Sequence, residues 1–235
     1  MKKIVCHPRL GEITLSRTLR ASRITLSVRP DGSIRLSFPA LVSERRALRF
    51  LEQKVEWAEQ VRTKQKAQNP VVSLADSFPT RRHRLRLLAG DYVRISVRIT
   101  EEEIIIRYPH SCSADSEQVQ EAARRGVVEA LRREAKELLP PWVDRLATRH
   151  GFRYRNIAIK ATHSKWGSCT AHNDLNFSLF LLLLPDELVE YVILHELCHT
   201  VHKNHSPRFH ALLDEVTNGR DRELAREMRK RYPSI

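Results

Sequence analysis

Two stretches near the N-terminus alternate apolar and polar side chains with a period of two. Residues 24–28 and 34–38 carry this pattern, and Pro30-Asp31-Gly32 lies between them. Such alternation places the apolar side chains on one face of a strand, and proline, aspartate and glycine favour a tight turn. The pattern therefore predicts a β-hairpin.

The middle of the chain continues with a helix and more strands. Ser43 is a good N-cap for a helix that extends to about Lys66. Residues 85–87 and 93–99 alternate around Gly90-Asp91 and predict a second hairpin. The apolar alternation from Glu103 to Tyr108 predicts one further strand.

Helical spacing replaces the strand pattern in the second half of the chain. Residues 116–139 predict a helix that Pro140-Pro141 breaks, since proline has no N–H to donate. The helix is expected to resume and to stop at Gly151.

A second group of strands should follow this helix. Ile157 and Ile159 are expected to begin a catalytic sheet, and residues 174–184 alternate imperfectly and predict a half-buried strand. That strand either lines a cleft and pairs with an extended peptide or is a core strand without substrate contact.

A buried amphipathic helix is predicted from Pro185 onward. Proline at the first helical position and the acids Asp186-Glu187 mark its start, because acids are favoured at the positive end of the helix dipole. Apolar residues then recur at helical spacing as far as Val201. His195 and His199 lie four residues apart, on one face of this helix.

The segment His195-Glu196-Leu197-Cys198-His199 has the spacing of a catalytic zinc site. Zinc lowers the pKa of a bound water to roughly 7, and the neighbouring Glu196 can accept its proton. Short motifs also occur by chance, but the helical context is the one that the chemistry requires. We therefore expect a hydrolase in which Glu196 is the base.

The third metal ligand is expected at His205. Ser206-Pro207 opens another helix, so His205 falls in the turn between two helices and can complete three ligands with an open fourth position. This spacing matches that of metzincins, whose glycine at the bend is His202 here. Either the turn differs or His202 adopts an unusual backbone angle.

A glutamate as third metal ligand fits the sequence less well than His205. The position at which such a glutamate is expected holds Asn218, which leaves Glu215 and Glu223 as weaker candidates. No residue is assigned as the oxyanion stabiliser; near in sequence are His202, Arg208, His210 and Tyr191.

Composition bounds the class of protein. With 235 residues, 41% of them hydrophobic, the chain can bury a sizeable core. No apolar signal-peptide core follows Met1, and the longest apolar run, residues 179–184, is far too short for a bilayer. Four cysteines are scattered without a Cys-x-x-Cys pair. We expect a cytoplasmic protein with reduced thiols and no membrane partner.

The net charge of +13 is unevenly distributed. Residues 185–235 hold 8 basic and 9 acidic side chains, so residues 1–184 hold 33 and 19, a balance of +14. This excess either binds nucleic acid or another polyanion or is a solvated surface that keeps the protein soluble.

Several motifs together resemble the YgjP-like metallopeptidase family. They include Lys165-Trp166-Gly167-Ser168-Cys169, the His195 to His199 motif, residues 204–209, and residues 23–32 near the N-terminus. The resemblance implies a predicted zinc-dependent hydrolase, akin to SprT-like and minigluzincin proteases, with ligands His195, His199 and His205 and the base Glu196. Two departures are Cys198, where a small residue is usual, and His210, where relatives often have tryptophan. From the residues themselves, Gly167 permits a turn or a close backbone approach, and the segment around it shapes the cleft.

The sequence therefore predicts an α+β fold. Residues 1–110 form a β-rich N-terminal region with one helix, and residues 111–235 form a zincin-like metallopeptidase core with an HExxH active-site helix. The expected function is Zn²⁺-dependent hydrolysis of a peptide or protein. Alternatives are hydrolysis of a nucleotide phosphoanhydride and a nucleic-acid-associated binding protein with a structural zinc. The residues do not specify an oligomeric state.

Overall fold

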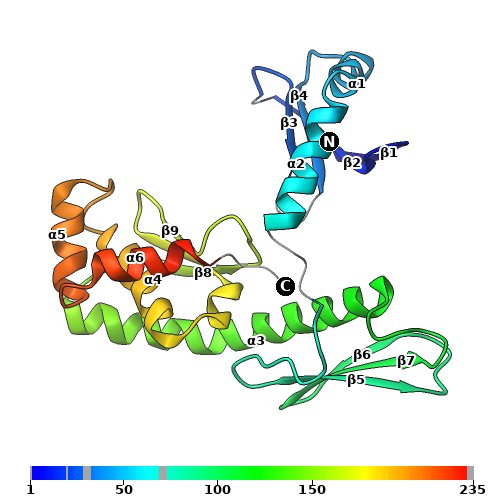
Figure 1. Ribbon diagram of the computed structural model, residues 1–235. Helices are drawn as coiled ribbons and strands as arrows, with labels where there is room; N and C mark the ends of the chain where they lie inside the picture. Colours follow the sequence, from blue (N-terminus) through cyan, green and yellow to red (C-terminus); the bar gives the residue numbers. More distant parts are fainter. Residues whose placement is uncertain (1, 20, 29–32, 69–72, 232–235) are drawn as a thin grey trace. The chain divides into compact units, whose positions relative to one another are not determined.

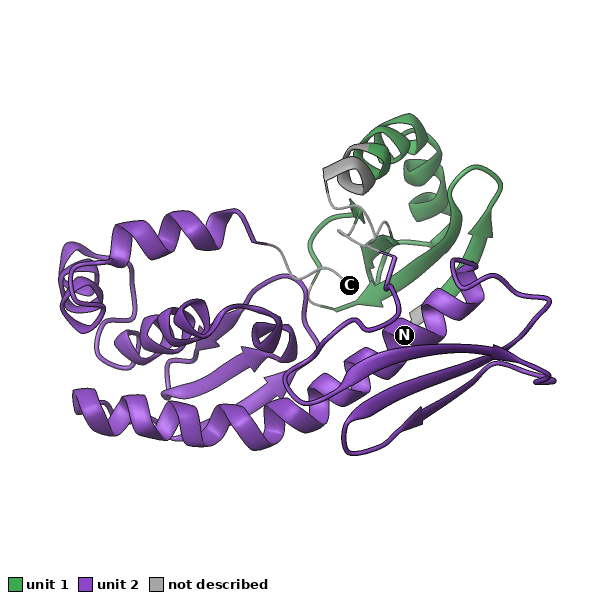
Figure 2. Ribbon diagram, turned by 60° about the horizontal axis from the view of Figure 1, so that its bottom comes forward, with its two compact units in different colours: residues 1–72 green, residues 73–235 purple. Residues whose placement is uncertain are grey.

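The alternating N-terminal stretches form one sheet in the computed structural model, which describes residues 2–19, 21–28, 33–68 and 73–231. Its strands have the order β1-β2-β4-β3: β1 (Lys2–His7), β2 (Gly11–Thr18), β3 (Thr25–Val28) and β4 (Ile34–Pro39). Apolar residues of β2 and β4 are buried together with Ala47, Leu51, Val55 and Ala58 of two helices, α1 (Glu44–Glu52) and α2 (Val55–Gln68). These elements make up the first of two compact units, Met1–Val72 (Figures 1 and 2).

The first predicted hairpin is confirmed, and the helix after it is divided. Strands β3 and β4 pair antiparallel, while the predicted turn Pro30-Asp31-Gly32 lies outside the described residues. The Oγ of Ser43 accepts a hydrogen bond from the N–H of Arg46 at 3.3 Å, as expected for an N-cap. The single helix expected to Lys66 is two, because the Lys54 N–H bonds the Leu51 carbonyl at 2.8 Å, three residues back, and tightens the last turn of α1.

The second unit, Ser73–Ile235, begins with a sheet of different pairing from the one expected. Its strands are β5 (Arg84–Gly90), β6 (Ser96–Ile99) and β7 (Glu103–Pro109), in the order β5-β7-β6. The predicted hairpin of β5 with β6 is wrong, since β5 pairs with β7 in parallel and β6 pairs with β7 antiparallel. Strand β7 takes the centre because it has the fullest buried face: Ile104, Ile106 and Tyr108.

Helix α3 (Glu117–His150) is continuous through Pro140 and Pro141, so the predicted break is wrong. Two prolines remove two backbone hydrogen bonds, at a cost of roughly 3 kcal/mol or more each. Leu139, Val143 and Leu146, on both sides of the prolines, are almost fully buried, and each contributes about 1.5–3 kcal/mol. Packing therefore holds the helix together where its local sequence would end it. Gly151 ends it as predicted, with a φ of 73° at the C-cap.

The length of α3 explains why the compact units do not divide near residue 110. Its N-terminal half packs on β6 and β7, and its C-terminal half packs on the segments around the histidine motif, within one core (Figure 1). The β5-β7-β6 sheet thus shares a core with the C-terminal elements, and the units divide at Val72 instead.

A third sheet precedes the histidine motif. Its order is β8-β10-β9, from β8 (Asn156–Lys160), β9 (Gly167–Cys169) and β10 (Asp174–Ser178). Ile157 and Ile159 lie in β8, as expected. The strand predicted over residues 174–184 ends at Ser178 and continues as a short 3₁₀ helix, η1 (Leu179–Leu183). Three helices complete the unit: α4 (Asp186–Cys198), α5 (Pro207–Val216) and α6 (Asp221–Arg229). No helix in the described ranges is both long and apolar enough to cross a membrane.

Candidate metal centre

Helix α4 brings two histidines together. Pro185 is the N-cap residue, one position before the first helical position at which it was expected. The acids Asp186 and Glu187 lie in the first turn, as the sequence predicts. His195 lies in the last turn, and His199 is the C-cap residue with helical backbone angles, φ −67° and ψ −15°. Their ring centroids are therefore only 4.9 Å apart.

His205 reaches the same place from the turn between α4 and α5. After His199 the chain reverses through hydrogen bonds from the N–H groups of Val201 and His202 to the carbonyl of Cys198. His202 is not among the described residues with positive φ, so this turn differs from one that needs glycine at the bend. Ser206 then caps α5, its Oγ accepting from the N–H of Phe209.

The three imidazoles form a set of nitrogen donors suited to a metal ion. One ring nitrogen from each of His195, His199 and His205 lies within 4.8 Å of the others, and the Nε2 atoms of His195 and His205 are 3.1 Å apart. Tetrahedral zinc with Zn–N bonds of about 2.0–2.1 Å separates two nitrogen ligands by about 3.3 Å. The donor type and the His195–His205 separation are therefore compatible with a metal ion such as zinc.

Hydrogen bonding and stacking fix the orientation of these rings. The Nδ1 of His199 donates to the carbonyl oxygen of His202 at 3.0 Å, which leaves Nε2 for a metal. The fully buried Phe209 lies against all three imidazoles: it stacks on His199 with centroids 4.4 Å apart and meets His195 and His205 edge to face at 4.9 and 4.8 Å. Sequence reasoning did not assign Phe209 a role.

Burial keeps two of the imidazoles neutral. Desolvation, and then the neighbouring His199 and His205, lower the pKa of His195 to about 4. Desolvation also lowers the pKa of His199, against the opposing hydrogen bond to the carbonyl of His202. Neutral imidazole is the form that binds metal, so the environment prepares these rings as ligands.

Glu196 is a buried carboxylate on the same helix. It is 6% exposed, and desolvation raises its pKa to about 7, against the opposing effects of Lys165 and of a hydrogen bond from the backbone of Cys169. Its Oε2 atom has no hydrogen-bond partner among the residues that the structure describes. A buried, unsatisfied carboxylate oxygen is costly for folding and is often functional.

Gly167 makes room for this carboxylate. A Cβ atom at residue 167 would lie 2.6 Å from the Cγ and 2.7 Å from the Oε1 of Glu196. The close backbone approach that the sequence predicts at Gly167 is therefore present, and its partner is Glu196. Cys169, which follows in β9, is a free thiol whose pKa burial raises, in keeping with a structural role.

The other candidate residues have different partners. Glu223 is paired with Arg220, and neither it nor Glu215 belongs to the metal-ligand cluster found among the described residues. The hydroxyl of Tyr191 donates to Asp221 at 2.9 Å, and the Nδ1 of His210 lies 3.0 Å from the other oxygen of the same carboxylate. Asp221 thus holds Tyr191 and His210 beside the histidine cluster, an arrangement that the sequence did not suggest.

Comparison with known proteins gives one extensive match. The family described as YgjP-like, metallopeptidase domain, matches residues 22–231. Two solved structures of metallopeptidase zymogens also align with the chain: jannalysin of Methanocaldococcus jannaschii (26% identity, TM-score 0.33) and abylysin of Pyrococcus abyssi (20% identity, TM-score 0.34). Each alignment covers 37% of this chain and 90% of the other. No curated protein matches the chain.

Proposed function

The chain belongs to the YgjP-like metallopeptidase domain family, and on this premise we propose that it is a zinc-dependent peptidase with Glu196 as its general base. His195, His199 and His205 would hold the ion. When bound, zinc would polarise a water molecule and the substrate carbonyl. The protein's own contribution is to present three oriented imidazoles and, on the same helix as two of them, a buried carboxylate of raised pKa.

Glu196 would carry the proton in both halves of the reaction. A carboxylate with a pKa near 7 accepts a proton from water at neutral pH and can return it to the leaving amine. Its free Oε2 is available for this transfer, while the Cys169 backbone holds the carboxylate in place. The observation that most strongly supports the proposal is a buried carboxylate with an unsatisfied Oε2 on the helix that carries His195 and His199.

Strand β9 offers a place for an extended peptide. It lies at the edge of its sheet. Strand β10, for which the sequence left both peptide pairing and a purely core role open, lies in the centre and has both edges occupied. Trp166 and Thr170 bond to Ser178 and Asp174 through their backbones, so Gly167 and Cys169, in alternate positions, direct their backbone groups away from β10. The Cys169 N–H donates to Glu196, which leaves the two carbonyls and the Gly167 N–H for a peptide. A peptide added to this edge would lie beside Glu196.

The alternatives have less support. A structural zinc usually has four protein ligands, whereas the cluster within the described ranges comprises three imidazoles. Hydrolysis of a nucleotide phosphoanhydride would use the same base and ion, and a screen of nucleoside triphosphates distinguishes it from peptidase activity.

Substitution of Glu196 by Gln tests the proposal. The zinc-loaded variant should keep one equivalent of metal and the melting temperature of the wild type, and lose about 10²–10⁴-fold in the rate of hydrolysis of denatured protein. Glu215→Gln, on the exposed surface of α5, is the matched control and should retain full activity. Undiminished hydrolysis by Glu196→Gln would rule out the assigned base.

A further inference from the structure

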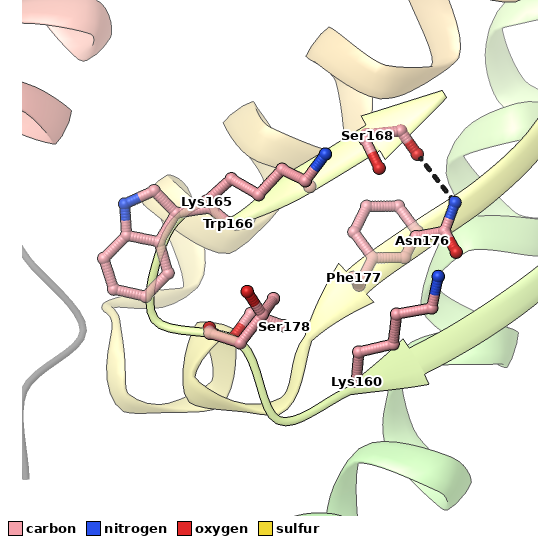
Figure 3. A pocket seen from close by; sticks show the side chains of 9 residues that line it. Lys160, Lys165, Trp166, Ser168, Asn176, Phe177 and Ser178 are labelled. Carbon is pink, nitrogen blue, oxygen red and sulfur yellow. Dashed lines mark hydrogen bonds between the residues drawn. The ribbon is translucent and has the colours of Figure 1, made fainter. Parts of the chain in front are cut away.

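A small pocket lies over the sheet that carries β9. It has a volume of about 100 Å³ and is lined by residues of all three strands and of the loop before β9. Lys160, Lys165, Ser168 and Asn176 supply its polar groups, and Trp166 forms part of its wall. Figure 3 shows the side chains of both lysines directed toward the Ser168 and Asn176 pair.

Neither lysine of this pocket is held in a close ion pair among the described residues, although Lys165 lies within electrostatic reach of Glu196. Lys160 and Lys165 make no ion pair with any carboxylate in the part of the chain that the structure describes. The hydroxyl of Ser168 also has no partner among those residues. Asn176 uses one amide hydrogen on the carbonyl of Ser168, at 3.4 Å, and keeps a second for a ligand. Two ammonium groups and two neutral donors together suit a carboxylate.

The pocket adjoins the candidate catalytic base through β9. Gly167 lines the pocket and also contacts the side chain of Glu196, and Lys165 acts electrostatically on the Glu196 carboxylate. Successive residues of a strand face opposite sides of the sheet, so Gly167 faces Glu196 while Ser168 faces away from it.

The same alternation applies to a peptide that adds to the edge of β9. Where one of its side chains points toward the Glu196 side, the next points toward the pocket side. A carboxylate two or three bonds from the peptide backbone can then extend over Ser168 toward the two lysines. The pocket can thus bind the side chain of the substrate residue next to the one that faces Glu196.

We propose that this pocket is a specificity subsite for an acidic side chain, so that the preferred substrates are peptides with Glu or Asp flanking the cleaved bond. The inference rests on the proposed peptidase function. It defines the substrate class through Lys160 and Lys165, with Ser168 and Asn176 as additional donors.

Mapping of cleavage sites tests the proposal. The zinc-loaded protein is given a reduced, denatured protein, the products are mapped by mass spectrometry, and one preferred sequence is made with Glu or Gln at the selected position. The Glu peptide should have a kcat/KM at least about tenfold higher, the value of a charge-assisted hydrogen bond. The variant Lys160→Met/Lys165→Met should lower this ratio to about one, and Lys160→Glu/Lys165→Glu should favour a Lys peptide. Lys136→Met, an exposed lysine of α3, should leave the ratio unchanged.

The ratio separates specificity from catalysis, because Lys165 also acts on Glu196 and its loss can change the rate for both peptides alike. Cleavage without an acidic preference, or a preference that survives the double substitution to Met, would overturn the subsite and leave the peptidase proposal intact.

A binding measurement keeps the subsite testable if the protein hydrolyses nothing, the outcome that would refute the peptidase proposal. The indole N–H resonance of Trp166, assigned with Trp166→Phe, should shift on titration with the blocked peptide Ala-Ala-Glu-Ala-Ala. It should not shift with the Gln counterpart or in Lys160→Met/Lys165→Met. The absence of any difference between the two peptides would reject the subsite.

Discussion

The histidine cluster depends on packing as much as on the motif. The spacing of His195, His199 and His205 was enough to predict three converging imidazoles, because four-residue spacing on a helix and a turn after it are local properties of the chain. Phe209, which contacts all three rings, comes from the next helix. The sequence shows that residue 209 is aromatic, but it does not show which imidazole rings Phe209 contacts.

Loss of the third imidazole should release the metal without unfolding the protein. His205 is exposed, so His205→Ala should leave the melting temperature of the metal-free protein nearly unchanged. Its zinc affinity should fall by more than the roughly 10–100-fold that loss of an outer-shell partner causes. Zinc content after dialysis against a weak chelator checks this.

Glu215→Ala and Glu223→Ala are the controls for His205→Ala and should keep the metal. If either glutamate variant lost zinc and His205→Ala retained it, the site would be of the glutamate type and the three-histidine assignment would be wrong.

Among the elements, the positions of several strands were predictable, but β1, β2 and β9 were not expected, and of the strand pairings only that of β3 with β4 was predicted correctly. Alternation identified β3, β4, β5, β6 and β7, because the pattern within a strand is local. The parallel pairing of β5 with β7 depends on which strand can bury most apolar surface against α3, a property of the assembled core. The prolines of α3 were misleading for the same reason, since tertiary packing outweighs a local break.

The start of α4, the helix that carries the histidine motif, is anchored by the loop before β5. Arg81 donates to the carbonyls of Leu182 and Leu184 and pairs with Asp186, the first residue of α4. Its loop is in turn held by the buried Glu134 of α3. That carboxylate accepts from Thr80 Oγ1 at 2.5 Å and from the N–H of Arg81 at 3.1 Å, and it lies 2.6 Å from the Nδ1 of His83.

Glu134→Gln should therefore destabilise the second unit. The amide keeps the shape but replaces an acceptor oxygen by a donor among groups that are themselves donors, so buried N–H and O–H groups lose partners. We expect a loss of roughly 2–4 kcal/mol in the free energy of unfolding, measured by urea denaturation. Glu137 lies three residues after Glu134 and pairs on the surface with Arg82. Its substitution by Gln should lower the free energy of unfolding by less than about 1 kcal/mol. Equal effects of the two substitutions would contradict the anchoring role.

On the scale of the whole molecule, the positive charge follows the division into units. Residues 1–72 hold 15 basic and 6 acidic side chains, which is +9 of the total of +13. Composition revealed that the excess lies outside the segment with the histidine motif. The contacts of α3 assign residues 73–110 to the C-terminal unit, so most of the excess belongs to residues 1–72. Nucleic-acid binding by this charge stays a prediction.

A salt series decides whether that charge binds phosphates. If the first unit binds nucleic acid, the affinity of the full-length protein for single- and double-stranded oligonucleotides should fall steeply with salt, each phosphate contact adding about 0.7–0.9 to the log–log slope. Arg45, Arg46 and Arg49 are exposed on α1, and their triple substitution by Gln should reduce the slope by as much as about two to three. The same change at Arg222, Arg226 and Arg229 of α6 removes equal charge from the other unit and should leave the slope unaltered. Equal effects of the two triples would indicate a response to net charge alone, and no binding at low salt would make the charge a solubility feature.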